Sequence, residues 1–406
     1  MRLLVICTDV PLPANTGGRV DVWRRLNALA EHGDRVALLC WHDAGRTPEP
    51  DAVTLAALGA VCEQLRVASI SRNLGELLRR LVLLWRMPSH AASRWVTTRS
   101  GGLLAWARSF QPDAILLDGL YGGAVAVHLA AALKVPLLYR SHNIEHLYMQ
   151  DQLARESRWQ RRIGLFANCL GLARFEKRIH RKALRVFDIS PDDRLFWVAN
   201  GSARIDWLPT SVDPSFALRI AQGSSTGAPI DILYFGNLNT PNNIEALQWL
   251  VREVLPRVSA RRTLRIVVAG SNPAVAVRMA VSGDARVHLV ANPADMAPLI
   301  GAARVIVNPM QAGSGVNLKS VEMLFSNALL VSTSAGVKGL SPAAKAAFAV
   351  ADSGAEFAAA VMAGLADAPT LSPMPCRAAA RAPFAGAHMA AVIQASLGGG
   401  VDDSSN

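Results

Sequence analysis

Short apolar runs alternate with longer amphipathic segments along most of this 406-residue chain. In the first half, the pattern predicts strands at residues 3–8, 35–41, 114–117 and 136–139, and a helix over 18–32. Short apolar cores with polar residues at both ends are typical of parallel strands that are buried on both faces. The first half is therefore expected to form an α/β domain.

The same alternation starts again after residues 208–213 and a glycine- and serine-rich linker, 222–227. It predicts strands at 230–235, 264–269, 287–290, 305–308 and 329–332, and helices over 244–251, 296–303, 320–325 and 383–397. We therefore expect two Rossmann-like, doubly wound domains that face each other across a cleft, with ligands at the carboxyl ends of the strands. The expected divisions are a first domain (1–215), a second domain (228–375), a C-terminal helix that packs back on the first domain (376–398) and a flexible tail (399–406).

Composition narrows the class of protein. Hydrophobic residues make up 51% of the chain and charged residues 18%, which excludes a disordered or fibrous protein. No apolar run reaches the roughly 18 residues that a membrane span needs, and the first apolar run ends at Asp9 and is typical of a strand rather than a signal peptide. The five cysteines (7, 40, 62, 169 and 376) lack metal-site spacing. We expect a reduced, cytoplasmic protein.

The formal net charge is +11, and much of it is concentrated in one stretch. Ten Lys and Arg residues lie between 152 and 185, against Glu156 and Glu176. The simpler interpretation is a solvated helix face. The other is a surface that contacts anionic lipid or a phosphorylated substrate.

The stretch 308–323 contains the most informative chemistry. A predicted strand ends at Asn308, and a loop with two glycines, Gly313 and Gly315, leads to a helix for which Asn317 is the expected N-cap. Glycines let a ligand approach the backbone, and the first N–H groups of a helix favour an anion. Lys319 is expected to add a full positive charge, and Glu322 a carboxylate for sugar hydroxyls. The alternative is an ordinary glycine loop with both side chains solvated.

Two other predicted strand ends carry notable residues. Gly17 and Gly18 stand between the first strand and the first helix, where bare N–H groups can meet phosphate or a hydroxyl. No GxGxxG motif is present, which disfavours a dinucleotide-dependent dehydrogenase. His142 follows the strand at 136–139; a hydrogen-bonded structural histidine is the usual alternative there.

Several of these segments, in this order, resemble the retaining glycosyltransferases of family 4, which have the GT-B fold. The matching segments are Pro11-Leu12-Pro13 with Gly17-Gly18, Ser141-His142-Asn143-Ile144-Glu145, Phe235-Gly236-Asn237-Leu238 with Pro241-Asn242-Asn243, and Gly313 to Glu322 followed by Ser332-Thr333 and Gly339-Leu340. The resemblance implies an acceptor-binding domain at 1–215, a nucleotide-sugar-binding domain at 228–375, and membership of the polysaccharide-assembly type.

The resemblance also implies roles for single residues. Glu322 would bind the ribose hydroxyls, and His142 would lie beside the transferred sugar, with His142 and Lys319 as the catalytic pair. The remaining donor-binding positions would be Gly17, Gly18, Gly236, Asn237, Val290 (towards the base), Gly313, Ser314, Gly315, Asn317 and Leu318. Ser314 stands where many members have a second glutamate, and Asn237, Asn239 and Thr240 where many have an Arg and a Lys. No cofactor and no metal are expected, because no DxD-type pair is suitably placed.

The expected partners are a nucleotide-sugar donor and a saccharide or lipid-linked acceptor, and no nucleic acid. A basic and aromatic patch is a candidate for peripheral binding at the inner face of the plasma membrane; it comprises Arg79, Arg80, Arg86, Trp85, Trp95, Trp159 and the 155–185 cluster. One alternative is a nucleotide-sugar epimerase or hydrolase on the same fold, which would need catalytic carboxylates. A more distant one is a basic nucleic-acid binder, although no base-stacking aromatic pattern accompanies the charge.

Overall fold

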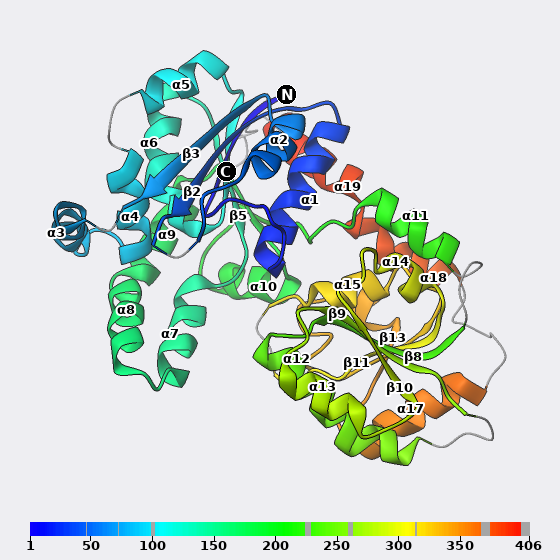
Figure 1. Cartoon of the computed structure of the whole chain (residues 1–406). Coiled ribbons are helices and arrows are strands. Elements are labelled where there is room, and N and C mark those ends of the chain that lie inside the picture. Colours follow the sequence, from blue (N-terminus) through cyan, green and yellow to red (C-terminus); the bar gives the residue numbers. More distant parts are fainter. Residues whose placement is uncertain are drawn as a thin grey trace. The chain divides into compact units, whose positions relative to one another are not determined.

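The chain divides into two compact units, each built on its own sheet (Figure 1). The structure, a computed structural model, describes residues 1–45, 47–71, 73–98, 102–223, 229–258, 263–312, 315–366 and 374–398. Unit 1 comprises residues 1–211 and 386–406, and unit 2 comprises 212–385.

Unit 1 contains a seven-stranded sheet in the order β3-β2-β1-β4-β5-β6-β7, with every pair parallel. Its strands are β1 (Arg2–Cys7), β2 (Arg35–Asp43), β3 (Gln64–Ile70), β4 (Ala114–Asp118), β5 (Leu137–Ser141), β6 (Arg185–Asp188) and β7 (Ile205–Trp207). Its helices are α1 (Gly17–Glu31), α2 (Ala52–Val61), α3 (Leu74–Leu83), α4 (Ser89–Thr98), α5 (Leu103–Phe110), η1 (Leu120–Gly122), α6 (Gly123–Leu133), α7 (Glu145–Arg155), α8 (Trp159–Cys169), α9 (Leu172–Lys182), α10 (Pro191–Ala199) and α19 (Gly386–Gly398).

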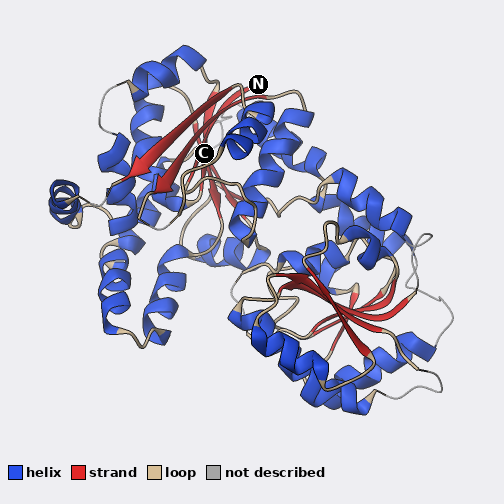
Figure 2. Ribbon diagram, viewed as in Figure 1, coloured by secondary structure: helices blue, strands red, loops and turns tan. Residues whose placement is uncertain are grey.

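Helices cover both faces of the unit 1 sheet, as Figure 2 shows. Successive side chains of a strand point to opposite faces. Leu3 and Val5 therefore pack with α1, α2 and α19, whereas Leu4 and Ile6 pack with α4, α5, α6 and α9. This double burial explains why the strands are continuous apolar runs rather than alternating ones.

Unit 2 repeats the plan with six parallel strands in the order β10-β9-β8-β11-β12-β13. Its strands are β8 (Ile230–Asn237), β9 (Ile266–Ser271), β10 (Val287–Ala291), β11 (Ala303–Asn308), β12 (Leu329–Ser332) and β13 (Phe348–Val350). Its helices are α11 (Pro214–Gly223), α12 (Pro241–Trp249), the π-helix η2 (Leu250–Val254), η3 (Leu255–Arg257), α13 (Val275–Ser282), α14 (Ala297–Gly301), α15 (Leu318–Met323), α16 (Pro342–Lys345), α17 (Gly354–Ala366), α18 (Met374–Arg381) and η4 (Ala382–Phe384).

Each sheet has one point where the strand order reverses. In unit 1 the chain moves outward from β1 through β2 to β3, and then returns to β4 on the other side of β1. In unit 2 the corresponding pair is β8 and β11. Ligands of doubly wound sheets bind at the carboxyl ends of such a pair, so these two places are where a site is expected.

The predicted fold class, two Rossmann-like parallel-sheet domains, is confirmed. The C-terminal region differs from the single helix expected over 376–398. The chain passes from unit 2 back to unit 1 between Ala385 and Gly386. Helix α18 therefore belongs to unit 2, and α19 belongs to unit 1, where it packs on α1. A Cβ on Gly386 would stand 2.9 Å from the Ala28 Cβ, so glycine permits this close approach. The cleft stays a prediction, and residues 399–406 lie outside the described residues.

Candidate active site

Helix α15 begins directly after the loop that follows β11. Gly315 has a φ of 74°, a left-handed value that favours glycine. Asn317 caps the helix, because its side-chain oxygen accepts from the Lys319 backbone N–H at 3.1 Å. The helix start predicted at Asn317 is therefore confirmed. Gly313 and Ser314, which were also expected to bind the donor, lie outside the described residues.

The side chain of Lys319 is enclosed by neutral polar groups. Its Nζ donates to the Oδ1 atoms of Asn243 and Asn308, each at 3.3 Å, and lies 4.4 Å from the centroid of the Tyr234 ring. Lys319 is 7% exposed. Because Tyr234 belongs to β8 and Asn308 ends β11, the amine lies where the strand order of unit 2 reverses.

This environment changes the charge of Lys319. Burial lowers the pKa of Lys319 to about 7, and the nearby carboxylate of Glu322 acts in the opposite direction. This lowering favours the neutral amine more than the sequence suggested, where a full positive charge was expected. A phosphate beside Nζ would favour the ammonium form, so anion binding at this site is coupled to proton uptake.

A second set of contacts orients the Asn308 amide. Its Nδ2 donates to Ser320 Oγ at 2.8 Å, and Ser320 Oγ donates to the carbonyl oxygen of Gly336 at 2.6 Å. These bonds leave Asn308 Oδ1 for the Lys319 amine. Sequence reasoning assigned no role to Asn308, although a polar residue at the end of a buried apolar run was a signal for one.

Gly236 makes room for the same lysine. It has a φ of 150°, and a Cβ there would stand 3.2 Å from Asn243 Nδ2 and 3.3 Å from Lys319 Cε. The neighbouring Asn237 uses its side-chain oxygen to accept from the Asn239 N–H at 3.1 Å, and its carbonyl accepts from Asn243 Nδ2 at 2.9 Å. In this structure Gly236 and Asn237 therefore shape the wall around Lys319.

The other donor-binding candidates of unit 2 are spread along the strand ends. Glu322 is half-buried on α15, one turn after Lys319 and close enough to influence its charge. Leu318 is the half-buried first residue of that helix. Val290 lies near the end of β10, and β9 separates it from β8. Val290 is thus two strands away from the strand that carries Tyr234.

In unit 1, α1 begins at Gly17 after Thr16, whose side chain makes no capping hydrogen bond. Gly17 and Gly18 are both exposed. A Cβ on Gly18 would have no neighbour within 4 Å. Packing within the protein therefore does not require a glycine at position 18.

His142 follows β5 and is held by a buried charged cluster. Its Nε2 lies 2.6 Å from Asp118 Oδ1, and its Nδ1 lies 3.7 Å from Asp21 Oδ2. Arg25 Nε donates to Asp118 Oδ2 at 2.7 Å and its Nη2 donates to Asp21, while Arg140 Nη2 donates to Asp21 at 3.4 Å. Asp118 ends β4, so this cluster occupies the strand-order reversal of unit 1.

The two carboxylates of this cluster stay ionised. Burial, the largest single effect, would raise the pKa of each, but Arg25 and the other positively charged or hydrogen-bonding neighbours together outweigh it. With the further help of His142, the pKa of Asp118 is lowered to about 2; with the help of Arg140, the pKa of Asp21 is held below its usual value. Sequence reasoning found His142 but not its partners, because residues 21, 25, 118 and 140 are distant in sequence.

Replacing Asp118 with asparagine should destabilise unit 1. The change leaves Arg25 buried with one carboxylate fewer, and breaking a buried ion pair in this way costs about 3 kcal/mol. The Asp118 pKa is lowered on folding, so its contribution is present above pH 4 and is lost as the pH falls towards 2. Urea unfolding at pH 7 and at pH 3 measures this, with the exposed Asp192→Asn as control. A loss below about 1 kcal/mol at pH 7 would show that the cluster is not stabilising.

A second buried acidic pair lies beside this cluster. Glu176 accepts from the backbone N–H groups of Glu145 and His146 at 2.8 and 3.1 Å, and His146 Nδ1 lies 2.6 Å from Glu176 Oε2. Glu145 Oε2 accepts from the Tyr121 hydroxyl at 3.1 Å. Burial, followed by the charge of Glu176, raises the pKa of Glu145 to about 7. These bonds anchor the start of α7, directly after the loop that carries His142.

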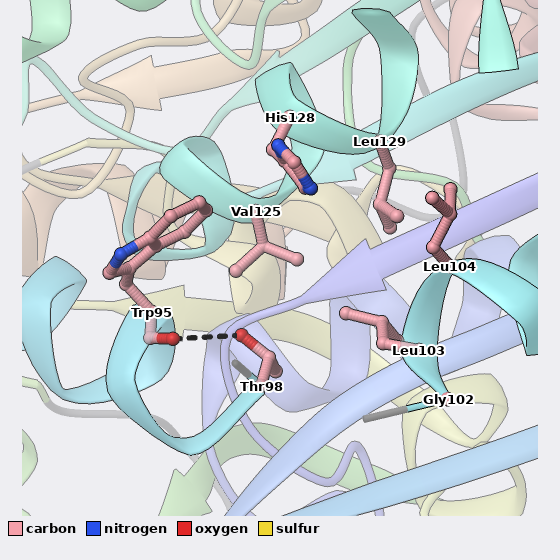
Figure 3. A pocket seen from close by; sticks show the side chains of 8 residues that line it. All are labelled: Trp95, Thr98, Gly102, Leu103, Leu104, Val125, His128 and Leu129. Carbon is pink, nitrogen blue, oxygen red and sulfur yellow. Dashed lines mark hydrogen bonds between the residues drawn. The ribbon is translucent and has the colours of Figure 1, made fainter. Parts of the chain in front are cut away.

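A cavity of about 450 Å³ lies between α4, α5 and α6 in unit 1 (Figure 3). Trp95 lines it and packs edge-on against His128, with 5.5 Å between the ring centroids. Trp95 is half-buried, whereas Trp85 and Trp159, the other tryptophans of the predicted basic and aromatic patch, are exposed. None of the sequence-predicted donor or catalytic residues lines this cavity.

The described ranges contain neither a metal-binding cluster nor a membrane-spanning helix. Those residues contain no group of three or more His, Cys, Asp or Glu placed to hold a metal ion. No helix in the same part of the chain combines the length and apolar character that crossing a membrane requires.

Comparison with known families decides the class of protein. Residues 16–209 match the family model described as "Glycosyl transferase 4-like domain", and residues 229–367 match "Glycosyl transferases group 1". The two matches fall on unit 1 and unit 2 in turn. The chain belongs to the family 4-like glycosyltransferases. This glycosyltransferase is also 24% identical over 351 residues to the "Uncharacterized 44.6 kDa protein in cps region" of Klebsiella pneumoniae, covering 83% of this chain and 84% of that protein.

Solved structures with the same architecture share little sequence with this glycosyltransferase. HepE from Anabaena in complex with UDP has a TM-score of 0.62 at 14% identity, over 98% of this chain and 100% of that chain. A glycosyltransferase from Rickettsia africae has a TM-score of 0.63 at 10% identity, over 100% of this chain and 99% of that chain. Sucrose-phosphate synthase from Thermosynechococcus elongatus has a TM-score of 0.62 at 18% identity, over 97% of this chain and 98% of that chain. These similarities show the fold, GT-B.

Proposed function

We propose that this glycosyltransferase moves a sugar from a nucleotide-sugar to a hydroxyl of a saccharide or lipid-linked acceptor in surface polysaccharide synthesis. The relative in a cps region supports the polysaccharide assignment. HepE, which has the same fold, is described in complexes with UDP and with UDP-glucose, which supports a nucleotide-sugar donor. The four described cysteines, Cys7, Cys40, Cys62 and Cys169, form no disulfide, which supports a cytoplasmic reaction.

One observation supports the proposed donor site most directly. A buried lysine amine lies at the strand-order reversal of unit 2, and each of its hydrogen bonds goes to a neutral amide oxygen. Such an amine gains most from an anion, and the two phosphates of a nucleotide-sugar supply one. Glu322, one helical turn away, offers a carboxylate acceptor for two adjacent ribose hydroxyls.

The proposed reaction keeps the configuration of the transferred sugar. The bond between the anomeric carbon and the phosphate oxygen breaks, and negative charge grows on the leaving diphosphate, where Lys319 stabilises it. The acceptor hydroxyl attacks from the same face, and an oxygen of that diphosphate takes its proton. We assign contact with the transferred sugar to His142, the base to the region of Val290, and phosphate or acceptor contact to Gly17 and Gly18. No metal takes part, so transfer should proceed unchanged in EDTA.

Replacing Glu322 with alanine should weaken donor binding. Hydrogen bonds to a charged group contribute about 1.5–3 kcal/mol, which corresponds to a rise of about 10- to 100-fold in the dissociation constant of the donor. Glu322→Gln, which keeps an acceptor oxygen, should lose less. Isothermal titration with the donor measures the three proteins side by side.

The control for this measurement is Glu253→Ala, which removes an exposed acid from the same unit. It should leave the dissociation constant within about twofold, because exposed ion pairs contribute little. Wild-type affinity in Glu322→Ala would contradict the ribose assignment, whatever the activity of that variant.

The donor and the reaction class can be identified together. A thermal-shift panel of UDP-, GDP- and ADP-sugars identifies the base and the sugar, and turnover is then assayed with and without saccharide acceptors. The UDP-GlcNAc 2-epimerase of Methanocaldococcus jannaschii also has this fold, with a TM-score of 0.55 at 9% identity. Rapid hydrolysis or epimerisation without an acceptor would favour that alternative over transfer.

A further inference from the structure

Helix α3 exposes an apolar stripe. Leu74, Leu77, Leu78, Leu81 and Val82 follow the spacing of one helix face, and Trp85 lies in the turn directly after the helix. Each of these six residues is between 42% and 74% exposed. The polar pair Glu76 and Arg80 is on the sheltered side instead, with side chains only 19% and 12% exposed and their charged atoms 3.3 Å apart. The described part of α3 contains no buried residue. An amphipathic helix of a water-soluble domain normally has the opposite orientation.

Helix α8 repeats this arrangement. Trp159, Ile163, Phe166 and Leu170 recur at intervals of four, three and four residues and are 39% to 67% exposed. Both α3 and α8 contact α4, and Figure 1 shows α3 and the α7–α8 pair as outlying elements of unit 1. Two exposed stripes of large apolar side chains on helices that both contact α4 form far more apolar surface than scattered single residues do.

Most charges beside these stripes are basic, although the half-buried Glu156 lies 3.8 Å from the Arg161 guanidinium. Arg79 and Arg86 are exposed next to the α3 stripe, and the Arg86 guanidinium lies 4.3 Å from the centroid of the Trp85 ring. Arg158, Arg161 and Arg162 are exposed at the start of α8, a helix without an acidic residue. A second copy of the chain would bring these arginines against each other. An anionic lipid surface neutralises them and accepts tryptophan at its headgroup level.

We propose that α3 and α8 dock unit 1 on an anionic membrane surface, with the two apolar stripes in the headgroup region and the flanking arginines on lipid phosphates. This inference does not depend on the proposed transferase reaction. Its test contains neither donor nor acceptor, so failure of the test leaves the donor site untouched.

The test is co-sedimentation of the full chain with sucrose-loaded vesicles of phosphatidylcholine. One set of vesicles also contains about 30 mol % phosphatidylglycerol, which makes the surface strongly anionic. We expect binding to the anionic vesicles that weakens as salt increases. Arg158→Gln with Arg161→Gln should lower the partition coefficient by about 25-fold, as expected for two interfacial arginines. Leu81→Asn with Trp85→Asn should lower it by at least about tenfold.

The matched control is Val275→Asn with Met279→Asn, which removes two equally exposed apolar side chains from α13 of unit 2. It should bind like the wild type, and thermal unfolding checks that all variants remain folded. Equal sedimentation with neutral and anionic vesicles would overturn the proposal. So would a dimer in solution that Leu81→Asn with Trp85→Asn dissociates, because that result assigns the surface to a second copy.

Discussion

Lys319→Met is expected to lower turnover by about 10²- to 10³-fold, while the dissociation constant of the donor rises by about tenfold or less. The methionine keeps most of the buried volume but removes the group that meets the leaving diphosphate. Charge on that group grows as the sugar–phosphate bond breaks, so the amine contributes more in the transition state than in the ground state. Steady-state kinetics and equilibrium titration separate the two quantities.

The same variant has a pH signature. The pKa of Lys319 is about 7 in the free protein, and both phosphates of a nucleotide-sugar are esterified and do not titrate nearby. Donor binding should therefore take up a proton above pH 7, and wild-type affinity should fall as the pH rises. Titrations at pH 8 in two buffers of different ionisation enthalpy measure this uptake. It should be absent in Lys319→Met and retained in Lys338→Met, which alters an exposed lysine of the same unit.

Folding stability gives an independent check. Because the folded pKa of Lys319 lies below the usual 10.5, the unfolded chain binds more protons between pH 7 and 10.5. The contribution of this group to stability therefore rises with pH across that window, and the rise should vanish in Lys319→Met. If Lys319→Met and Lys338→Met turn over at the same rate, the assignment of Lys319 to the leaving diphosphate is contradicted.

His142→Ala is expected to lower the rate of transfer by about 10²-fold, because loss of a positioned group at the reacting sugar has this order of effect. Removal of the imidazole leaves Asp118 paired with Arg25 and Asp21 paired with Arg25 and Arg140, so the fold should persist. The acceptor-dependent rate and the donor dissociation constant are measured together, and only the rate should change strongly.

The control for this prediction is His128→Ala, an exposed histidine that lines the cavity beside Trp95. It should keep a rate close to that of the wild type. If His128→Ala loses activity and His142→Ala does not, the cavity between α4, α5 and α6 takes over as the candidate site for the transferred sugar.

The central strands were predictable because burial on both faces makes them continuous apolar runs. Residues 3–8, 230–235 and 305–308 were predicted as strands and correspond to β1, β8 and β11. Edge strands such as β7 (Ile205–Trp207) and β13 (Phe348–Val350) were not predicted, because each is only three residues long. The turn from β11 into α15 was predictable from local chemistry, since a glycine loop and an N-cap need no distant partner.

The burial and the lowered pKa of Lys319 were not predictable, because its partners come from three segments. Asn243 and Tyr234 lie more than 70 residues away in sequence, and only the sheet brings them to the end of β11. The cluster around His142 has the same origin, since Asp21 and Asp118 meet only after β1 and β4 pair. Helix α3 was not among the predicted elements, and only the structure shows that its apolar face is exposed.

The most direct test of the donor site is a crystal structure of the chain with the nucleotide-sugar that the thermal-shift panel selects. We expect a phosphate oxygen within hydrogen-bonding distance of Lys319 Nζ, and both ribose hydroxyls on the carboxylate of Glu322. A nucleotide bound elsewhere, with Lys319 still bonded only to Asn243 and Asn308, would contradict the account.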